Sequence, residues 1–217
     1  MNSEFDVITT RWWLIRHAPV INAAEKRLSG QNDVPADVSD GERFACVAGR
    51  LPSGAVWITS HLQRTRQTAQ ALQDAGAEKA EPLAEPGFAE QAFGAWTGLT
   101  WAEIGDLGAE AQAFWDAPAA VQPPPDDDFA SESFTDVCVR VAEKLEELTE
   151  QYAGRDIVCV AHAGSIRAAI AHALGVSPEN ALALEVQNTH LTRIDHVTTG
   201  LRAQRGGSWR VVGFNMI

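Results

Sequence analysis

Short apolar runs alternate along this chain with longer segments in which apolar residues recur at helical spacing. Three of the runs end in polar residues, as strands buried on both faces of a parallel sheet do: residues 12–16, 55–60 and 156–162. Three of the longer segments have helical spacing: residues 39–51, 61–76 and 133–154. This alternation predicts an α/β fold of three layers, α/β/α, with a mostly parallel central sheet.

Other segments complete the predicted architecture. Ser133 is a suitable N-terminal cap for the helix that follows it. Residues 189–197 and 208–216 alternate apolar and polar positions around a Gly-Gly pair, which predicts a hairpin at one edge of the sheet. Prolines and aspartates interrupt the periodicity at about residues 116–133, which predicts a lid loop. No repeat or linker divides the chain, so residues 1–217 are expected to form a single domain.

Composition bears on which partners the protein can bind and on where in the cell it is expected. With 29 acidic and 17 basic residues, the net charge of −12 opposes binding to nucleic acid or to an anionic membrane. Three widely spaced cysteines without a CxxC pair suggest neither a disulfide framework nor a zinc site. The sequence has no signal-peptide pattern and no apolar run long enough to cross a bilayer, so we expect a cytoplasmic protein.

Polar side chains gather where the predicted strands end or the following helices begin. They are Arg16 and His17, Arg64 and Arg66, Glu90, and His162 followed by Ala163 and Gly164. Taken singly, each is as well explained as a strand-end polar residue, a solvated helix face or a loop acid. Because the carboxyl ends of parallel strands meet at one edge of a sheet, we expect the two histidines, Arg16 and one arginine of the helix start to converge there on a ligand site.

Two histidines and two arginines around one pocket suit a dianionic phosphoryl group. The planar guanidinium fork matches phosphate oxygens, and phosphoryl transfer depends mainly on positioning and on neutralising charge. A histidine can attack phosphorus to form a covalent intermediate, and a carboxylic acid can protonate the leaving oxygen. The sequence contains no HExxH, EF-hand or P-loop pattern, so no metal site and no cofactor are predicted.

Five motifs resemble, in order, those of the histidine phosphatase superfamily, the phosphoglycerate-mutase-like enzymes. They are LIRHAPV, TSHLQRTRQTAQAL, LAEPGFAEQAFGAWTGLTWAEI, SESFTDVCVRV and VCVAHAGSIRAAI. The resemblance extends from about residue 11 to about residue 195 and implies the phosphoglycerate-mutase-like fold. The size of the chain and two of the motifs are similar to the small bacterial branch that includes α-ribazole phosphatases.

The resemblance implies a role for each matching residue. His17 would be the nucleophile that becomes phosphohistidine, and Glu90 would be the proton donor, whereas Glu85 and Glu103 match the position of the acid less well. His162 would complete the catalytic set by binding phosphoryl oxygens. The substrate-binding residues would be these five: Arg16, Arg64, Asn22, Arg27 and Ala163.

Three positions depart from the family pattern. Ala18 and Ala163 replace glycines that usually follow the two histidines, and Ser131 replaces a glycine in the lid. Alanine does not easily adopt positive φ, so we expect an ordinary backbone conformation at Ala18 and Ala163.

These residues predict a metal-independent phosphomonoesterase that acts on a small phosphorylated metabolite, with α-ribazole 5'-phosphate as the suggested substrate. An acidic lid without Lys or Arg would repel a second phosphate, which argues against the alternative of a mutase-type phosphotransferase. A second alternative is a catalytically silent phosphate- or protein-binding module. Trp96, Trp101 and Trp115 either stack on a nucleoside-like base or belong to the core. The sequence leaves the oligomeric state open, a homodimer included.

Overall fold

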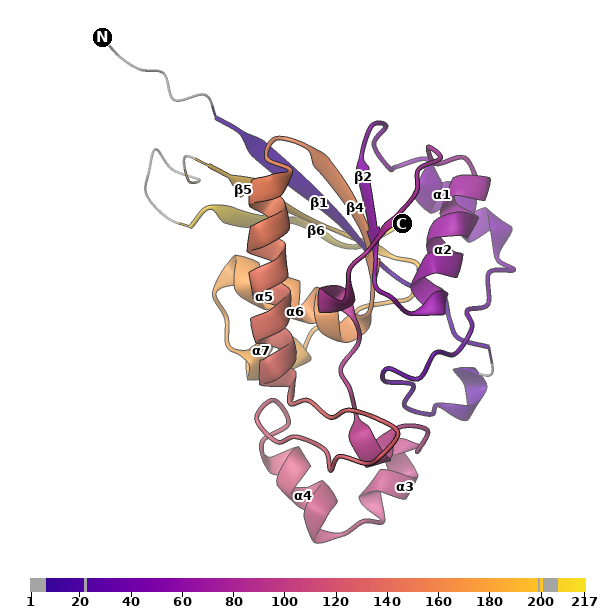
Figure 1. The fold of residues 1–217 in the computed structure, drawn as a ribbon, viewed down its shortest axis with the longest axis vertical. Helices are drawn as coiled ribbons and strands as arrows, with labels where there is room; N and C mark the ends of the chain where they lie inside the picture. The colour runs from indigo at the N-terminus through magenta and orange to yellow at the C-terminus, as the bar shows by residue number, and fades with distance from the viewer. Residues whose placement is uncertain (1–6, 22, 199, 201–206) are drawn as a thin grey trace.

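The computed structural model describes residues 7–21, 23–198, 200 and 207–217, and these contain one central mixed sheet (Figure 1). Its strands are β1 (Thr9–Arg16), β2 (Val56–Thr59), β3 (Leu83–Ala84), β4 (Asp156–Ala161), β5 (Leu191–Val197) and β6 (Trp209–Met216). They lie in the order β3-β2-β4-β1-β5-β6. The first four are parallel, while β5 pairs antiparallel with β1 and β6 antiparallel with β5. The predictions of a mostly parallel sheet and of an antiparallel strand pair at its edge are confirmed, while residues 201–206 of the predicted hairpin lie outside the described residues.

Helices cover both faces of the sheet, which confirms the three predicted layers (Figure 1). One face packs against α1 (Gly41–Ala48) and α2 (Gln63–Asp74), and the other against α5 (Phe134–Gln151), α6 (Ala163–Leu174) and α7 (Pro178–Leu182). Alternating side chains of β4 divide the core: Ile157 and Cys159 point to the α5 side and Val158 to the α2 side. Ser133 caps α5 through a capping box with Asp136, as predicted for this residue.

A small cap lies beyond the carboxyl ends of the parallel strands, at the bottom of Figure 1. It consists of α3 (Trp101–Gly105) and α4 (Ala109–Asp116), which close over a separate buried cluster. Three short 3₁₀ helices complete the element order: Ala23–Glu25, Pro86–Phe88 and Gly94–Trp96.

The segment predicted as a lid follows this cap. Residues 117–133 contain no helix and no extended strand, and Ser131 joins Phe93 in an isolated bridge. The irregular structure matches the prediction, while movement of this segment as a lid stays a prediction. Within the described ranges, no helix combines the length and the apolar character needed to cross a membrane.

Candidate functional site

The two histidines of the sequence analysis meet at the carboxyl edge of the sheet. β1 ends at Arg16 and β4 ends at Ala161, and these two residues are paired in the parallel register. The residues that follow, His17 and His162, therefore lie side by side, with ring centroids 5.0 Å apart. The expected convergence is confirmed, because adjacent parallel strands deliver their last residues to the same edge.

His17 is held as a neutral ring with one free nitrogen. Its Nδ1 donates a hydrogen bond of 2.6 Å to the carbonyl oxygen of Ala18, which leaves the lone pair on Nε2. Burial, and then the guanidinium groups of Arg64 and Arg16, lower the pKa of His17 well below its usual value. Asn188 donates to the backbone oxygen of His17 at 2.7 Å and fixes the residue from β5's side of the sheet. A neutral, immobilised imidazole of this kind is suited to act as a nucleophile.

His162 is completely buried and contacts two polar neighbours. Ser60 Oγ lies 2.8 Å from its Nε2, and Arg64 Nε donates to its Nδ1 at 3.3 Å. Burial and the nearby cations lower the pKa of His162 well below its usual value, so this ring is also neutral. Since the Ser60 hydroxyl can donate as well as accept, it can support either tautomer of His162. A tautomer protonated on Nδ1 would give up the hydrogen bond that this nitrogen accepts from Arg64 Nε.

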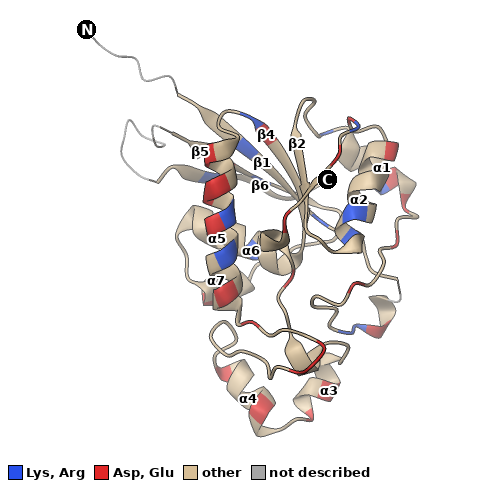
Figure 2. Ribbon diagram, viewed as in Figure 1, with Lys and Arg blue, Asp and Glu red and all other residues tan. Residues whose placement is uncertain are grey.

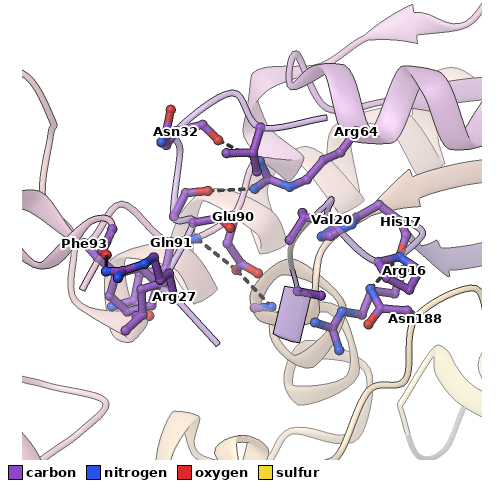
Figure 3. A pocket seen from close by; sticks show the side chains of 18 of the residues that line it. Arg16, His17, Val20, Arg27, Asn32, Arg64, Glu90, Gln91, Phe93 and Asn188 are labelled. Carbon is purple, nitrogen blue, oxygen red and sulfur yellow. Dashed lines mark hydrogen bonds between the residues drawn. The ribbon is translucent and has the colours of Figure 1, made fainter. Parts of the chain in front are cut away.

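Guanidinium groups lie near His17 in the cavity (Figure 3). Arg64 is buried at the start of α2, where it donates to the backbone oxygens of Gly30 and Asn32 at 2.7 and 2.9 Å. Arg16 donates to the backbone oxygen of Val186, and its buried Nε has no hydrogen-bond partner among the described residues. A buried donor without a partner is costly, so Arg16 Nε is suited to bind an oxygen atom of a ligand.

Glu90 lies in the same cavity, on the side of Arg64 and Arg16 that faces Phe93 in Figure 3. Its Oε1 accepts hydrogen bonds of 3.0 Å from the backbone N–H groups of Gly164 and Gln91. The loop that carries Glu90 is anchored by Arg140 of α5, which donates to the backbone oxygens of Gly87 and Glu90. The same guanidinium group forms an ion pair of 2.7 Å with Glu132. The acid is thus positioned by a residue 50 places later in the chain.

A cavity of about 590 Å³ contains these groups. Its volume is in the range of small-molecule sites. Of the eight predicted site residues, five line it: Arg16, His17, Arg27, Arg64 and Glu90. His162 lies beside it, behind His17 and Arg64, and Ala163 packs against the apolar core. Asn22 lies outside the described residues.

Arg27 lies at the opposite end of the cavity from His17, next to Phe93 (Figure 3). Its side chain is 48% exposed and forms ion pairs with Glu25 and Glu103. It also donates to the backbone oxygen of Gly98 at 2.8 Å. The structure therefore places Arg27 at the mouth, and its role in substrate binding stays a prediction.

Sequence reasoning missed three residues of the site. Arg167 lines the cavity from α6, while its Nε donates to the backbone oxygen of Leu184 at 2.7 Å. Asn188 was not singled out, because its partner His17 is 171 positions away. Gly164 was noted only as the start of a helix, yet a Cβ built on it would lie closer than 3.0 Å to Glu90 Oε1. The available signal for these two was their separation of three positions at the start of α6, which places Gly164 and Arg167 on neighbouring positions of the helix surface.

The backbone accommodates the two alanines that replace family glycines. Neither Ala18 nor Ala163 is among the residues with positive φ, which confirms the expectation of an ordinary conformation. The Ala18 N–H donates to Thr68 Oγ1 at 2.9 Å, and the Ala18 carbonyl orients His17. The added methyl groups therefore leave the two histidines in place.

Known proteins match most of this chain, including the segments that carry these site residues. The model of the histidine phosphatase superfamily (branch 1) matches residues 12–207. A bifunctional protein of Mycobacterium tuberculosis is 29% identical over 161 residues, 73% of this chain and 42% of that protein. The chain therefore spans about two fifths of the length of the first curated relatives it matches.

Two further relatives match a larger share of their own length. A glucosyl-3-phosphoglycerate phosphatase of Mycolicibacterium vanbaalenii is 31% identical over 181 residues, 77% of this chain and 75% of that protein. A 2,3-bisphosphoglycerate-dependent phosphoglycerate mutase of Gloeobacter violaceus is 27% identical over 198 residues, 88% of each chain.

Solved structures resemble the whole chain. A mycobacterial glucosyl-3-phosphoglycerate phosphatase superposes with a TM-score of 0.77 at 25% identity, covering 96% of this chain and 100% of its own. A protein of Escherichia coli described as a putative α-ribazole-5'-P phosphatase superposes with a TM-score of 0.76. At 21% identity over 95% of this chain and 96% of its own, this second structure shares the fold only.

Proposed function

The chain belongs to the histidine phosphatase superfamily, and we propose that it is a phosphatase that hydrolyses small phosphate monoesters through a phosphohistidine at His17. One observation carries the proposal. His17 Nδ1 is committed to the Ala18 carbonyl, so the lone pair of the neutral ring is on Nε2, in a cavity with Glu90 and guanidinium groups. This arrangement supplies a nucleophile, an acid and charge neutralisation in one place.

The first step transfers the phosphoryl group to the protein. His17 Nε2 attacks phosphorus, the bond between phosphorus and the leaving oxygen breaks, and the protonated Glu90 carboxyl gives its proton to that oxygen. Arg16, Arg64 and Arg167 neutralise the dianionic phosphoryl oxygens, to which the unpartnered Arg16 Nε can donate. A direct N–H contact from His162 to the phosphoryl group stays a prediction, because this ring lies behind His17 and Arg64.

The second step returns the histidine to its starting state. Glu90, now a carboxylate, removes a proton from water, the water oxygen attacks phosphorus, and the bond to His17 Nε2 breaks to release inorganic phosphate. The described residues contain no cluster of three or more His, Cys, Asp or Glu suited to hold a metal ion. All the groups these two steps require are protein side chains, so we propose that the reaction needs no metal.

Hydrolysis, and not mutase turnover, is the reaction we propose. No Lys or Arg occurs in the sequence between Lys79 and Arg140, and Figure 2 shows acidic residues without basic ones on α3 and α4. A cap of this charge disfavours retention of a bisphosphate intermediate. Robust conversion of 3- to 2-phosphoglycerate in the presence of 2,3-bisphosphoglycerate would refute this part of the proposal.

The decisive test is hydrolysis of p-nitrophenyl phosphate in excess EDTA, with the wild type beside His17→Ala. We expect turnover that is insensitive to EDTA and absent from the variant, with orthovanadate as a competitive inhibitor. Activity that survives in His17→Ala would contradict the assigned nucleophile. A substrate panel then compares α-ribazole 5'-phosphate with glucosyl-3-phosphoglycerate, and the α-ribazole assignment fails if its kcat/KM does not exceed that of p-nitrophenyl phosphate.

A further inference from the structure

Two exposed tryptophans of the cap lie side by side, and one of them lines the cavity. Trp101, the first residue of α3, lines the cavity and is 45% exposed. Trp115, in α4, is 49% exposed, and its ring centroid is 5.3 Å from that of Trp101. We call these two residues the tryptophan rim.

The packing of the cap does not account for the tryptophan rim. The buried cluster of the cap consists of Leu28, Trp96, Ile104, Ala111 and Phe114. Trp96, considered in the sequence analysis together with the rim residues, is part of this core, where its Nε1 donates to Glu110 at 2.9 Å. The rim residues are outside it, although Trp115 packs its ring against Phe114 at 5.3 Å. Large apolar side chains left in water beside a polar cavity are typical of ligand sites.

The charges around the rim exclude one kind of ligand. Arg27 lines the mouth, but Glu25 and Glu103 already pair with its guanidinium group. The sequence supplies no Lys or Arg from the cap itself, because none occurs between Lys79 and Arg140. A leaving group with a carboxylate or a second phosphate would therefore meet acidic residues without a free cation from the cap to pair with it.

We propose that the tryptophan rim binds the leaving group of the substrate, and that this group is a planar aromatic ring without negative charge. The inference rests on the proposed function, in which the phosphoryl group occupies the His17 end of the same cavity. The ring stacks on Trp101, and the neighbouring Trp115 ring packs against Trp101 with the two planes tilted by 50°. Stacking of a heteroaromatic base on an aromatic side chain commonly changes affinity by about 10-fold or more.

The experiment compares two esters that share one reacting centre. AMP and ribose 5-phosphate both carry the phosphoryl group on a primary 5-hydroxyl, and only AMP has an aromatic ring. We expect the wild type to favour AMP in kcat/KM by about 10-fold. In Trp101→Ala this ratio should fall to about 1, mainly through the KM for AMP, and Trp101→Phe should restore part of it.

Leu107→Ala is the matched control. Leu107 lies in the same cap, is 43% exposed and does not line the cavity. Its removal should leave the AMP preference unchanged, so a loss there would trace the effect to general damage of the cap. Binding of AMP and ribose 5-phosphate to His17→Ala, measured by calorimetry, gives a readout that requires no turnover.

The outcomes separate the two proposals. If the wild type hydrolyses p-nitrophenyl phosphate, AMP and ribose 5-phosphate in a His17-dependent way, but without preference for AMP, the rim proposal is wrong and the phosphatase mechanism stands. A preference that persists in Trp101→Ala also overturns it. If the wild type hydrolyses none of the three and His17→Ala binds AMP no tighter than ribose 5-phosphate, both proposals fail.

Discussion

Gly164→Ala should separate activity from stability, because the atom that an added Cβ would meet belongs to Glu90, the proposed catalytic acid. Gly164 is the second residue of α6 and donates its N–H to Glu90 Oε1 at 3.0 Å. A Cβ built on it would lie closer than 3.0 Å to that oxygen. The backbone at this position is helical, so the main effect of alanine is displacement of the Glu90 side chain.

The expected change in stability is small. Alanine in place of glycine favours a helix by up to about 1 kcal/mol. The lost hydrogen bond to Glu90 costs about 1.5 kcal/mol if the carboxylate moves away. These effects nearly cancel, so the melting temperature should change by no more than a few degrees in a chain of this size.

The expected change in activity is large. The Glu90 carboxylate must move by about 1 Å to restore an ordinary contact, and a misplacement of that size can reduce the rate by about 100-fold. The loss should be greater for an alkyl phosphate than for p-nitrophenyl phosphate, because p-nitrophenolate leaves with little help from an acid. The assay is therefore kcat/KM for both substrates together with thermal unfolding.

Two variants control this experiment. Gly41→Ala, in the first turn of α1, adds a Cβ with no atom within 4 Å and should not change activity. In the Glu90→Gln background, Gly164→Ala should add less than about 3-fold, because both changes act through the same carboxylate. The reasoning is refuted if Gly164→Ala keeps its activity toward the alkyl phosphate. It is also refuted if the activity loss of the double variant equals the product of the losses of Gly164→Ala and Glu90→Gln.

Three further predictions concern protonation, the acid loop and salt. Burial and nearby guanidinium groups lower the pKa values of His17 and His162 in the folded protein. Below about pH 6.5 the unfolded chain therefore binds more protons than the folded protein does. The free energy of unfolding should decrease as the pH falls below this value. The urea midpoint should therefore drop less in His17→Asn than in the wild type between about pH 7.5 and about pH 5.5, and equal drops would contradict this. Arg140→Lys keeps the positive charge but removes the guanidinium group that donates to two backbone oxygens of the Glu90 loop. We expect kcat for an alkyl phosphate to fall by about 10-fold at similar KM. An unchanged kcat would show that Arg140 does not position Glu90. Since Arg64 is buried and the net charge is −12, kcat/KM should not decrease when NaCl rises from about 20 to about 200 mM, whereas a decrease would indicate steering by exposed cations.

The sheet and the histidine pair could be predicted because their signals are local. A continuous apolar run that ends in polar residues marks a buried parallel strand, and adjacent parallel strands bring Arg16, His17 and His162 to one edge. The helix α7, Pro178–Leu182, was not predicted, because five residues are too few to show helical periodicity. Its Ser177 cap and the proline at its start were the only local signals.

The support of the site could not be predicted, because it depends on contacts between distant parts of the chain. Arg140 reaches the Glu90 loop from α5, and Asn188 reaches His17 from the segment before β5. The sequence drew attention to Ala163 as a departure from a family glycine. The structure shows that the neighbouring Gly164 is the position without room for a side chain, which only the packing of Glu90 against α6 reveals.

The distribution of charge differs between the carboxyl edge of the sheet and the cap. The carboxyl edge of the sheet gathers Arg16, Arg64 and Arg167 in a chain whose net charge is −12, so attraction for the phosphoryl group acts at short range inside the cavity. The cap contributes acidic residues and the exposed Trp101, to which we have assigned binding of the leaving group. In the proposed function, the chemical steps and the choice of substrate therefore depend on different elements. Changes in α3 and α4 should therefore alter which ester is preferred, while changes at the ends of β1 and β4 should reduce turnover of every ester.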